Sequence, residues 1–156
     1  MDEAQRWVDA VDRAYPTLRP WRYDHYWRCQ ADGKIVIGKD AKRGIGRFYP
    51  LSRLPQGARN GYTRACNFPV QGSCADASML ALEAIDRLLF EHEIDGGPVA
   101  WLHDEIILEV PDADAEQARE LLEKAMVDAF VETFPDAPLN GLVEVRIGDN
   151  WAAVKG

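Results

Sequence analysis

The chain has 156 residues, the size of one ordinary domain, and 47% of them are hydrophobic, which supplies a core and excludes a disordered tail. Its three cysteines lack a Cys-x-x-Cys pair, so neither a disulfide framework nor a zinc knuckle is expected, and a reducing cytoplasm is the default compartment. No run approaches the ~20 apolar residues of a membrane helix, and the acidic start MDEAQRWVDA does not resemble a signal peptide.

Charge is divided unevenly along the chain. Residues 1–72 contain 13 Lys and Arg against 7 Asp and Glu, a net +6, whereas residues 73–156 carry −14, so the total is −8. Such an asymmetry fits a basic track for a polyanion beside a cation-binding centre. Taken alone, the pattern favours the simpler interpretation that acidic helix faces keep the protein in solution.

The first half of the chain predicts two helices and a hairpin or loop. The helices are expected at residues 2–14, with Trp7, Val8 and Val11 on one side, and at 18–30, where the aromatic residues are expected to pack rather than to stack on bases. A short strand follows at residues 34–37. The basic, Gly-rich stretch after it predicts a hairpin or loop, whose Lys and Arg side chains are in most proteins simply solvated.

Two longer helices dominate the second half. Residues 72–92 predict a helix with one buried stripe, made of Ala75, Met79, Leu82, Ile85 and Leu89. Residues 115–133 predict another helix, which Asp112 or Asp114 would cap.

Strands are expected between and after these helices. β-prone runs on either side of residues 103–105 predict two short strands joined by a tight turn, and a last strand is expected at residues 142–147. The order of elements predicts an α+β domain in which helices cover an antiparallel sheet.

The expected turn carries His103, Asp104 and Glu105 inside the apolar run AWLHDEIILEVP. A solvated hairpin tip is one interpretation, although Asn-Gly or Asp-Gly is the ordinary tip and adjacent acids repel each other. A His-Asp phosphohydrolase would need more histidine ligands than His25 and His92 supply. A Mg²⁺ site for two-metal phosphoryl transfer is the third interpretation, and it requires another carboxylate from elsewhere in the chain.

Three segments together resemble the C-terminal part of family A DNA polymerases, the DNA polymerase I type. They are TRACNFPVQGSCAD (63–76), WLHDEIILEVP (101–111) and GDNWAAVKG (148–156), in the family's order and with helix-length and strand-length gaps between them. YPTLRPW and GRFYPL resemble the segment that leaves the fingers and re-enters the palm, so the resemblance covers essentially the whole chain. It implies that residues 1–156 form a partial polymerase palm with a motif C hairpin.

In this family the HDE segment is motif C. The resemblance implies that Asp104 is a ligand of two Mg²⁺ ions, that Glu105 is a secondary carboxylate, and that His103 lies near the primer 3′ end. The two metal ions of such a site stabilise the attacking and leaving oxygens.

Further residues match the family's contacts to primer–template DNA. Asn67 and Gln71 correspond to polar residues that face the minor groove, whose acceptors report base-pair geometry; without that context they would be ordinary local caps. Many members carry an arginine four residues before the asparagine. Here that position is Thr63, so Arg64 and Arg59 are the candidate arginines for DNA binding.

Two of the family's motifs have no counterpart in these residues. Motif A, resembling DYSQIELR, carries the first metal-binding aspartate, and motif B is the nucleotide-binding helix; neither Asp24 nor Asp40 stands in a matching context. We therefore expect a fragment or subunit of a split or truncated DNA-directed DNA polymerase, inactive alone. A second polypeptide with fingers and motif A would complete it, with primer–template DNA and dNTPs as substrates, in a bacterial or phage-infected cell. A non-catalytic DNA-binding remnant is the alternative.

Overall fold

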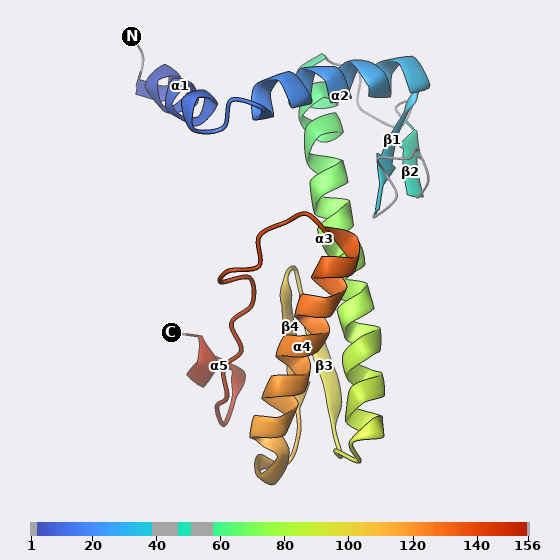
Figure 1. Ribbon diagram of the computed structural model, residues 1–156, viewed down its shortest axis with the longest axis vertical. Helices are drawn as coiled ribbons and strands as arrows, with labels where there is room; N and C mark the ends of the chain where they lie inside the picture. The colour runs from blue at the N-terminus through green and yellow to red at the C-terminus, as the bar shows by residue number, and fades with distance from the viewer. Residues whose placement is uncertain (1–2, 39–46, 51–57, 156) are drawn as a thin grey trace. The chain divides into compact units, whose positions relative to one another are not determined.

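A computed structural model describes residues 3–38, 47–50 and 58–155, with the side chains of all of these except 47–50 and 58–60 (Figure 1). Contacts divide the chain into two compact units, Met1–Val70 and Gln71–Gly156. The predicted α+β class is confirmed, because helices accompany two antiparallel pairs of strands. No helix in the described ranges is long and apolar enough to cross a membrane.

Unit 1 contains the two predicted helices and the predicted strand. Its elements are α1 (Glu3–Ala14), α2 (Leu18–Asp32), β1 (Lys34–Ile37), β2 (Arg47–Pro50) and the first part of α3 (Ala58–Glu91). β1 and β2 pair antiparallel, with Ile35 opposite Tyr49. The other lysines and arginines of the basic stretch, from Lys39 to Arg43 and at Arg53, lie outside the described residues.

The predicted start of the long helix at residue 72 is wrong, because α3 already begins at Ala58 and contains Pro69. Glycine and proline in this stretch indicate a break by local propensity alone. Packing outweighs that propensity: Ala65 is fully buried against Cys29 of α2 and Ile35 of β1, and Phe68 packs against the same cluster. The apolar core of unit 1 thus holds the N-terminal turns of α3 in helical form.

The buried stripe of α3 also differs from the prediction. Met79 is 53% exposed, whereas Ala77, Ala81, Ile85 and Leu89 are buried at a strict spacing of four residues. Residues four apart form one ridge on a helix surface, and small alanines along that ridge let a neighbouring element approach closely. The sequence of α3 contains several rows of apolar residues, and the row that includes the alanines faces the core.

The end of α3 closes with two backbone hydrogen bonds that reverse the chain. The Ile94 amide donates to the Leu89 carbonyl at 3.0 Å, and the Glu93 amide donates to the Phe90 carbonyl at 3.2 Å. This pairing is the Schellman pattern, in which the left-handed residue is usually glycine. Here that residue is Glu93, with φ of 56°.

Unit 2 is built on the predicted hairpin of β3 (Gly97–Leu102) and β4 (Glu105–Glu109), which pair antiparallel with Trp101 opposite Ile106. Gly96 precedes β3, and a Cβ there would come within 2.2 Å of the Glu109 carbonyl oxygen, so the backbones meet more closely than a side chain allows. Ile106 is buried and Leu108 packs beside it, so alternate residues of β4 face the helices.

The core of unit 2 lies between the hairpin, α3 and α4 (Ala115–Thr133). The helix at residues 115–133 is confirmed, and it buries Ala118, Leu121, Leu122, Ala125 and Ala129 against α3 and Ile106. Asp114 occupies its N-cap position but its side chain makes no cap hydrogen bond. Figure 1 shows α4 running alongside α3 and the hairpin.

The predicted strand at residues 142–147 is wrong. That stretch has no regular secondary structure and pairs with no strand among the described residues, and only Val145 of this stretch packs against the core cluster. Apolar alternation predicts an extended backbone, whereas a strand also needs a partner edge for its amides and carbonyls. Beyond it, α5 (Trp151–Val154) was not predicted.

Candidate functional site

The tip of the β3–β4 hairpin is a two-residue turn made of His103 and Asp104. Both residues are exposed, and Glu105 is already the first residue of β4, opposite Leu102. His103 has φ of 57°, and Asp104 is not among the residues with positive φ. Positive φ at the first turn residue alone is the type II′ pattern, in which glycine normally stands. A histidine in this position stores backbone strain, and such strain concentrates at functional sites.

Trp101 braces this turn from β3. Its indole Nε1–H donates a hydrogen bond of 2.8 Å to the carbonyl oxygen of His103. The bond fixes the peptide plane between His103 and Asp104, because that carbonyl belongs to the same peptide unit as the Asp104 amide. The backbone of the turn is therefore held by a side chain in addition to the strand ladder.

Glu105 is held by the C-terminal segment. The Trp151 indole Nε1–H donates to Glu105 Oε1 at 2.9 Å, and Lys155 Nζ lies 3.0 Å from Glu105 Oε2. The hydrogen bond from Trp151, and then the one from Lys155, hold the pKa of Glu105 below its ordinary value. This carboxylate is thus ionised at neutral pH, and each of its two oxygens already has a partner side chain.

Asp104 lies close to the part of α3 that belongs to unit 2. Partial burial, and then the negative charge of Asp104, raise the pKa of the Cys74 thiol on α3. The fold thereby brings together QGSCAD (71–76) and HDE (103–105), which belong to two of the segments on which the resemblance rests. Gln71 is exposed and stands one helical turn before Cys74, so both share one face of α3.

The other predicted DNA contacts stand on α3 within unit 1. Asn67 is exposed and Arg64 is half-buried, and their spacing of three residues places them on one helix face. The role of Arg64 in DNA binding stays a prediction, because its place on α3 fixes only that it stands near Asn67 on the helix surface. Arg59 lies in the first turn of α3, and its side chain is outside the described residues.

The described residues do not form a complete metal site. Nowhere in the described ranges do three His, Cys, Asp or Glu side chains gather in a way that would hold an ion. Asp104 offers hard carboxylate oxygens at an exposed position, which suits Mg²⁺, an ion bound through one or two carboxylates together with phosphates and waters. The donor chemistry therefore fits one protein ligand of Mg²⁺, and further ligands must come from outside these residues.

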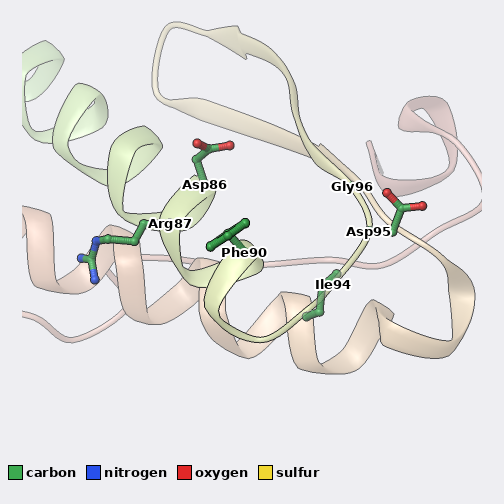
Figure 2. A pocket seen from close by; sticks show the side chains of 6 residues that line it. All are labelled: Asp86, Arg87, Phe90, Ile94, Asp95 and Gly96. Carbon is green, nitrogen blue, oxygen red and sulfur yellow. The ribbon is translucent and has the colours of Figure 1, made fainter.

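A hollow of about 430 Å³ lies away from the turn, where α3 passes into β3. Figure 2 shows its lining: Asp86, Arg87 and Phe90 come from the end of α3, and Ile94, Asp95 and Gly96 from the following turn. The six residues of β3 separate this end of the hairpin from His103 by roughly 20 Å. The hollow is therefore not part of the site at the turn.

Four residues at this site were not predicted to act there: Cys74, Trp101, Trp151 and Lys155. All four lie in segments that carry the resemblance, which could have drawn attention to them. Their contacts could not be predicted, because Trp151 is separated from Glu105 by 46 positions and no local pattern joins the two.

Comparison with known proteins identifies the family of this chain. The family model of DNA polymerase family A matches residues 1–153. The chain is similar to DNA polymerase I of Pseudomonas aeruginosa, with 37% identity over 151 residues, or 96% of this chain and 16% of that protein. It is also similar to the thermostable DNA polymerase I of Thermus filiformis, with 29% identity over 155 residues, or 98% of this chain and 17% of that protein.

A solved structure shares the fold. It is the POL domain of Pol1 from M. smegmatis, in complex with a DNA primer–template and a dNTP. The TM-score is 0.70 at 21% sequence identity, and the match covers 81% of this chain and 22% of that one. Relatives also include a mitochondrial and a chloroplastic DNA polymerase I of rice. The chain spans about one sixth of the curated relatives it matches. Because the family model matches residues 1–153, the chain belongs to DNA polymerase family A.

Proposed function

We propose that these residues supply Asp104 as a Mg²⁺ ligand in a DNA-directed DNA polymerase that uses dNTPs. The observation that carries the proposal is the braced turn, which exposes the Asp104 carboxylate beside α3. A strained two-residue turn on a packed hairpin holds one carboxylate in a fixed place, as metal-dependent phosphoryl transfer requires. Polymerases of this family use Mg²⁺.

The roles of the side chains follow from their chemistry. The metal, when bound, would stabilise charge on the attacking and leaving oxygens. Asp104 would hold it, and the exposed imidazole of His103 would contact the primer 3′ end. Gln71 and Asn67 carry both donors and acceptors, which suits the minor-groove edges of a primer–template duplex.

The charge distribution supports DNA binding on the first unit. Residues 1–72 carry a net +6, Arg64 stands three residues before Asn67 on α3, and Arg59 lies in the first turn of the same helix. Lysine and arginine on such a surface bind DNA through phosphates, with strong dependence on salt. We include Arg64 and Arg59 in the proposed DNA contacts for this reason.

Asp104 needs a partner carboxylate, because no segment of the 156 residues resembles motif A or motif B. We propose that another polymerase segment provides both motifs, and a second polypeptide with fingers and motif A is the arrangement we favour. This chain together with those residues forms the complete polymerase. The free Cys29 and Cys66 thiols, both buried, suit a reducing bacterial or phage-infected cytoplasm.

Primer extension by the complete polymerase tests the proposal. Asp104→Asn should lower the extension rate by about 100- to 1,000-fold, since a lost metal ligand removes several kcal/mol of transition-state stabilisation. Binding of primer–template DNA should stay within about twofold, because the carboxylate itself repels phosphate. Asp95→Asn, an exposed acid at the other end of the hairpin, is the matched control and should leave the rate unchanged.

Three results would contradict parts of the proposal. Extension by Asp104→Asn at the wild-type rate would exclude the metal-ligand role. A wild-type chain that binds primer–template DNA but gives no extension when motifs A and B are supplied would instead identify a non-catalytic DNA-binding remnant. Extension by the 156-residue chain alone would show that no completing segment is needed.

A further inference from the structure

The C-terminal segment forms a closed contact with the residue that follows Asp104. Glu105 accepts the Trp151 indole N–H at 2.9 Å on one oxygen and pairs with Lys155 Nζ at 3.0 Å on the other. Lys155 Nζ also lies 4.6 Å from the centroid of the Trp151 ring, within cation–π range. Each of the three side chains therefore contacts the other two.

Residues 146–155, here called the C-terminal hook, are folded so that both donors point at one carboxylate. The Asn150 side chain caps α5 by accepting the Ala153 amide at 3.1 Å, and Arg146 donates to the Val154 carbonyl at 3.1 Å. A Cβ on Gly148 would come within 2.8 Å of Val154 Cγ1, so the segment packs tightly on itself. α5 lies alongside the hairpin (Figure 1).

Asp104 stands between two braced neighbours. Trp101 holds the carbonyl of His103 on one side, and the hook holds Glu105 on the other. A ligand residue is fixed in place when the groups around it are fixed, and such supporting contacts typically change metal affinity strongly when they are removed. The hook thus contacts the residue that follows the proposed metal ligand.

We propose that the C-terminal hook positions the metal-binding turn, with Trp151 and Lys155 as positioning residues and Glu105 as their anchor. This inference rests on the proposed function of Asp104. It assigns Glu105 a role other than metal binding, because a cation on its carboxylate would lie beside the Lys155 ammonium, which is 3.0 Å from Oε2.

Amide hydrogen exchange on the 156-residue chain tests the positioning directly. Trp151→Phe keeps the ring and deletes the donor, so the amides of Leu102 and Glu105, the pair that closes the strand ladder at the turn, should exchange about fivefold faster, the effect of losing one net hydrogen bond. Trp7→Phe, at an exposed tryptophan of α1, is the matched control and should leave these rates unchanged. Unchanged exchange in Trp151→Phe would overturn the proposal.

The Mg²⁺ requirement of the complete polymerase supplies the functional readout. Lys155→Met should raise the Mg²⁺ concentration for half-maximal extension by about three- to tenfold, and Lys155→Arg should restore it, because losing a contact that supports the neighbour of a metal ligand lowers metal affinity. The KM for dNTP and the urea midpoint of unfolding should not change, which separates positioning from general destabilisation. Failure of Lys155→Arg to restore the requirement would overturn the ion-pair role.

The two proposals fail in distinguishable ways. If Asp104→Asn keeps full extension, the metal-ligand role fails, and the Mg²⁺ effect of the hook falls with it. If Asp104→Asn abolishes extension while Trp151→Phe and Lys155→Met leave both turn exchange and Mg²⁺ requirement unchanged, only the role of the hook is excluded.

Discussion

Replacing His103 by glycine is expected to stabilise the chain while slowing primer extension by the complete polymerase. His103 holds a φ of 57°, a backbone conformation that costs an L-residue roughly 1–2 kcal/mol. Glycine removes that strain but loses roughly 0.5–1 kcal/mol to its greater freedom when unfolded. The net gain is about 0.5–1 kcal/mol, which moves a urea midpoint up by about 0.3–0.5 M for an m-value near 2 kcal/mol/M.

The assay pairs urea denaturation of the 156-residue chain with primer extension by the complete polymerase. Extension should fall by about tenfold in His103→Gly, because the imidazole that we propose contacts the primer end is lost and the reacting groups are less well positioned. His103→Ala removes the same imidazole but keeps the strained backbone, so it should slow extension without raising the midpoint.

Glu93 provides a matched control, since its φ of 56° is nearly the same and it lies at the other end of β3 from the turn. Glu93→Gly should raise the midpoint by a similar amount and leave extension unchanged. If Glu93→Gly stabilises the chain and His103→Gly does not, the turn is not strained in the way argued here. If His103→Gly extends primers at the wild-type rate, the imidazole has no part in the reaction.

Two further predictions concern the cores of the two units. In unit 2, Ile85→Ala should lower the free energy of unfolding by about 2–5 kcal/mol in urea denaturation, because the side chain is fully buried, whereas Ile147→Ala, at a residue 51% exposed, should cost far less. In unit 1, burial, and then the charge of Arg28, lower the pKa of His25. The unfolded chain then binds more protons near pH 6.5, so stability should fall as the pH drops below about 6.5. His25→Gln should remove that part of the pH dependence; a wild-type unfolding midpoint that does not change between pH 7.5 and 5 would contradict it.

The hairpin and α4 were predictable because local pattern and tertiary packing agree there. β-prone runs flank a short polar turn, and α4 repeats its apolar residues at helical spacing over its whole length, Ala115–Thr133. Residues 142–147 show the limit of the same reasoning, since their alternation indicated an extended backbone but not the absence of a paired edge within the described residues.

The start of α3 and the contacts of the hook could not be predicted for a different reason. Pro69 argues locally against a helix, and only the burial of Ala65 against α2 and β1 outweighs it. Trp151 and Lys155 reach Glu105 from the end of the chain, a contact that no spacing rule encodes. Local physics therefore predicted the elements of the site, whereas its bracing depends on contacts between distant segments.

The structure also changes what the adjacent acids at the turn mean. Two neighbouring carboxylates repel each other unless a cation is near, and that repulsion alone would argue for a metal ion at the turn. Lys155 already pairs with Glu105, so the acid pair needs no metal for its own stability. Asp104 is the residue whose charge is not explained in this way: it is exposed, set on a strained turn, and braced through both neighbours. The metal-ligand role therefore depends on how rigidly the fold holds Asp104, and the variants of Trp151 and Lys155 test that rigidity.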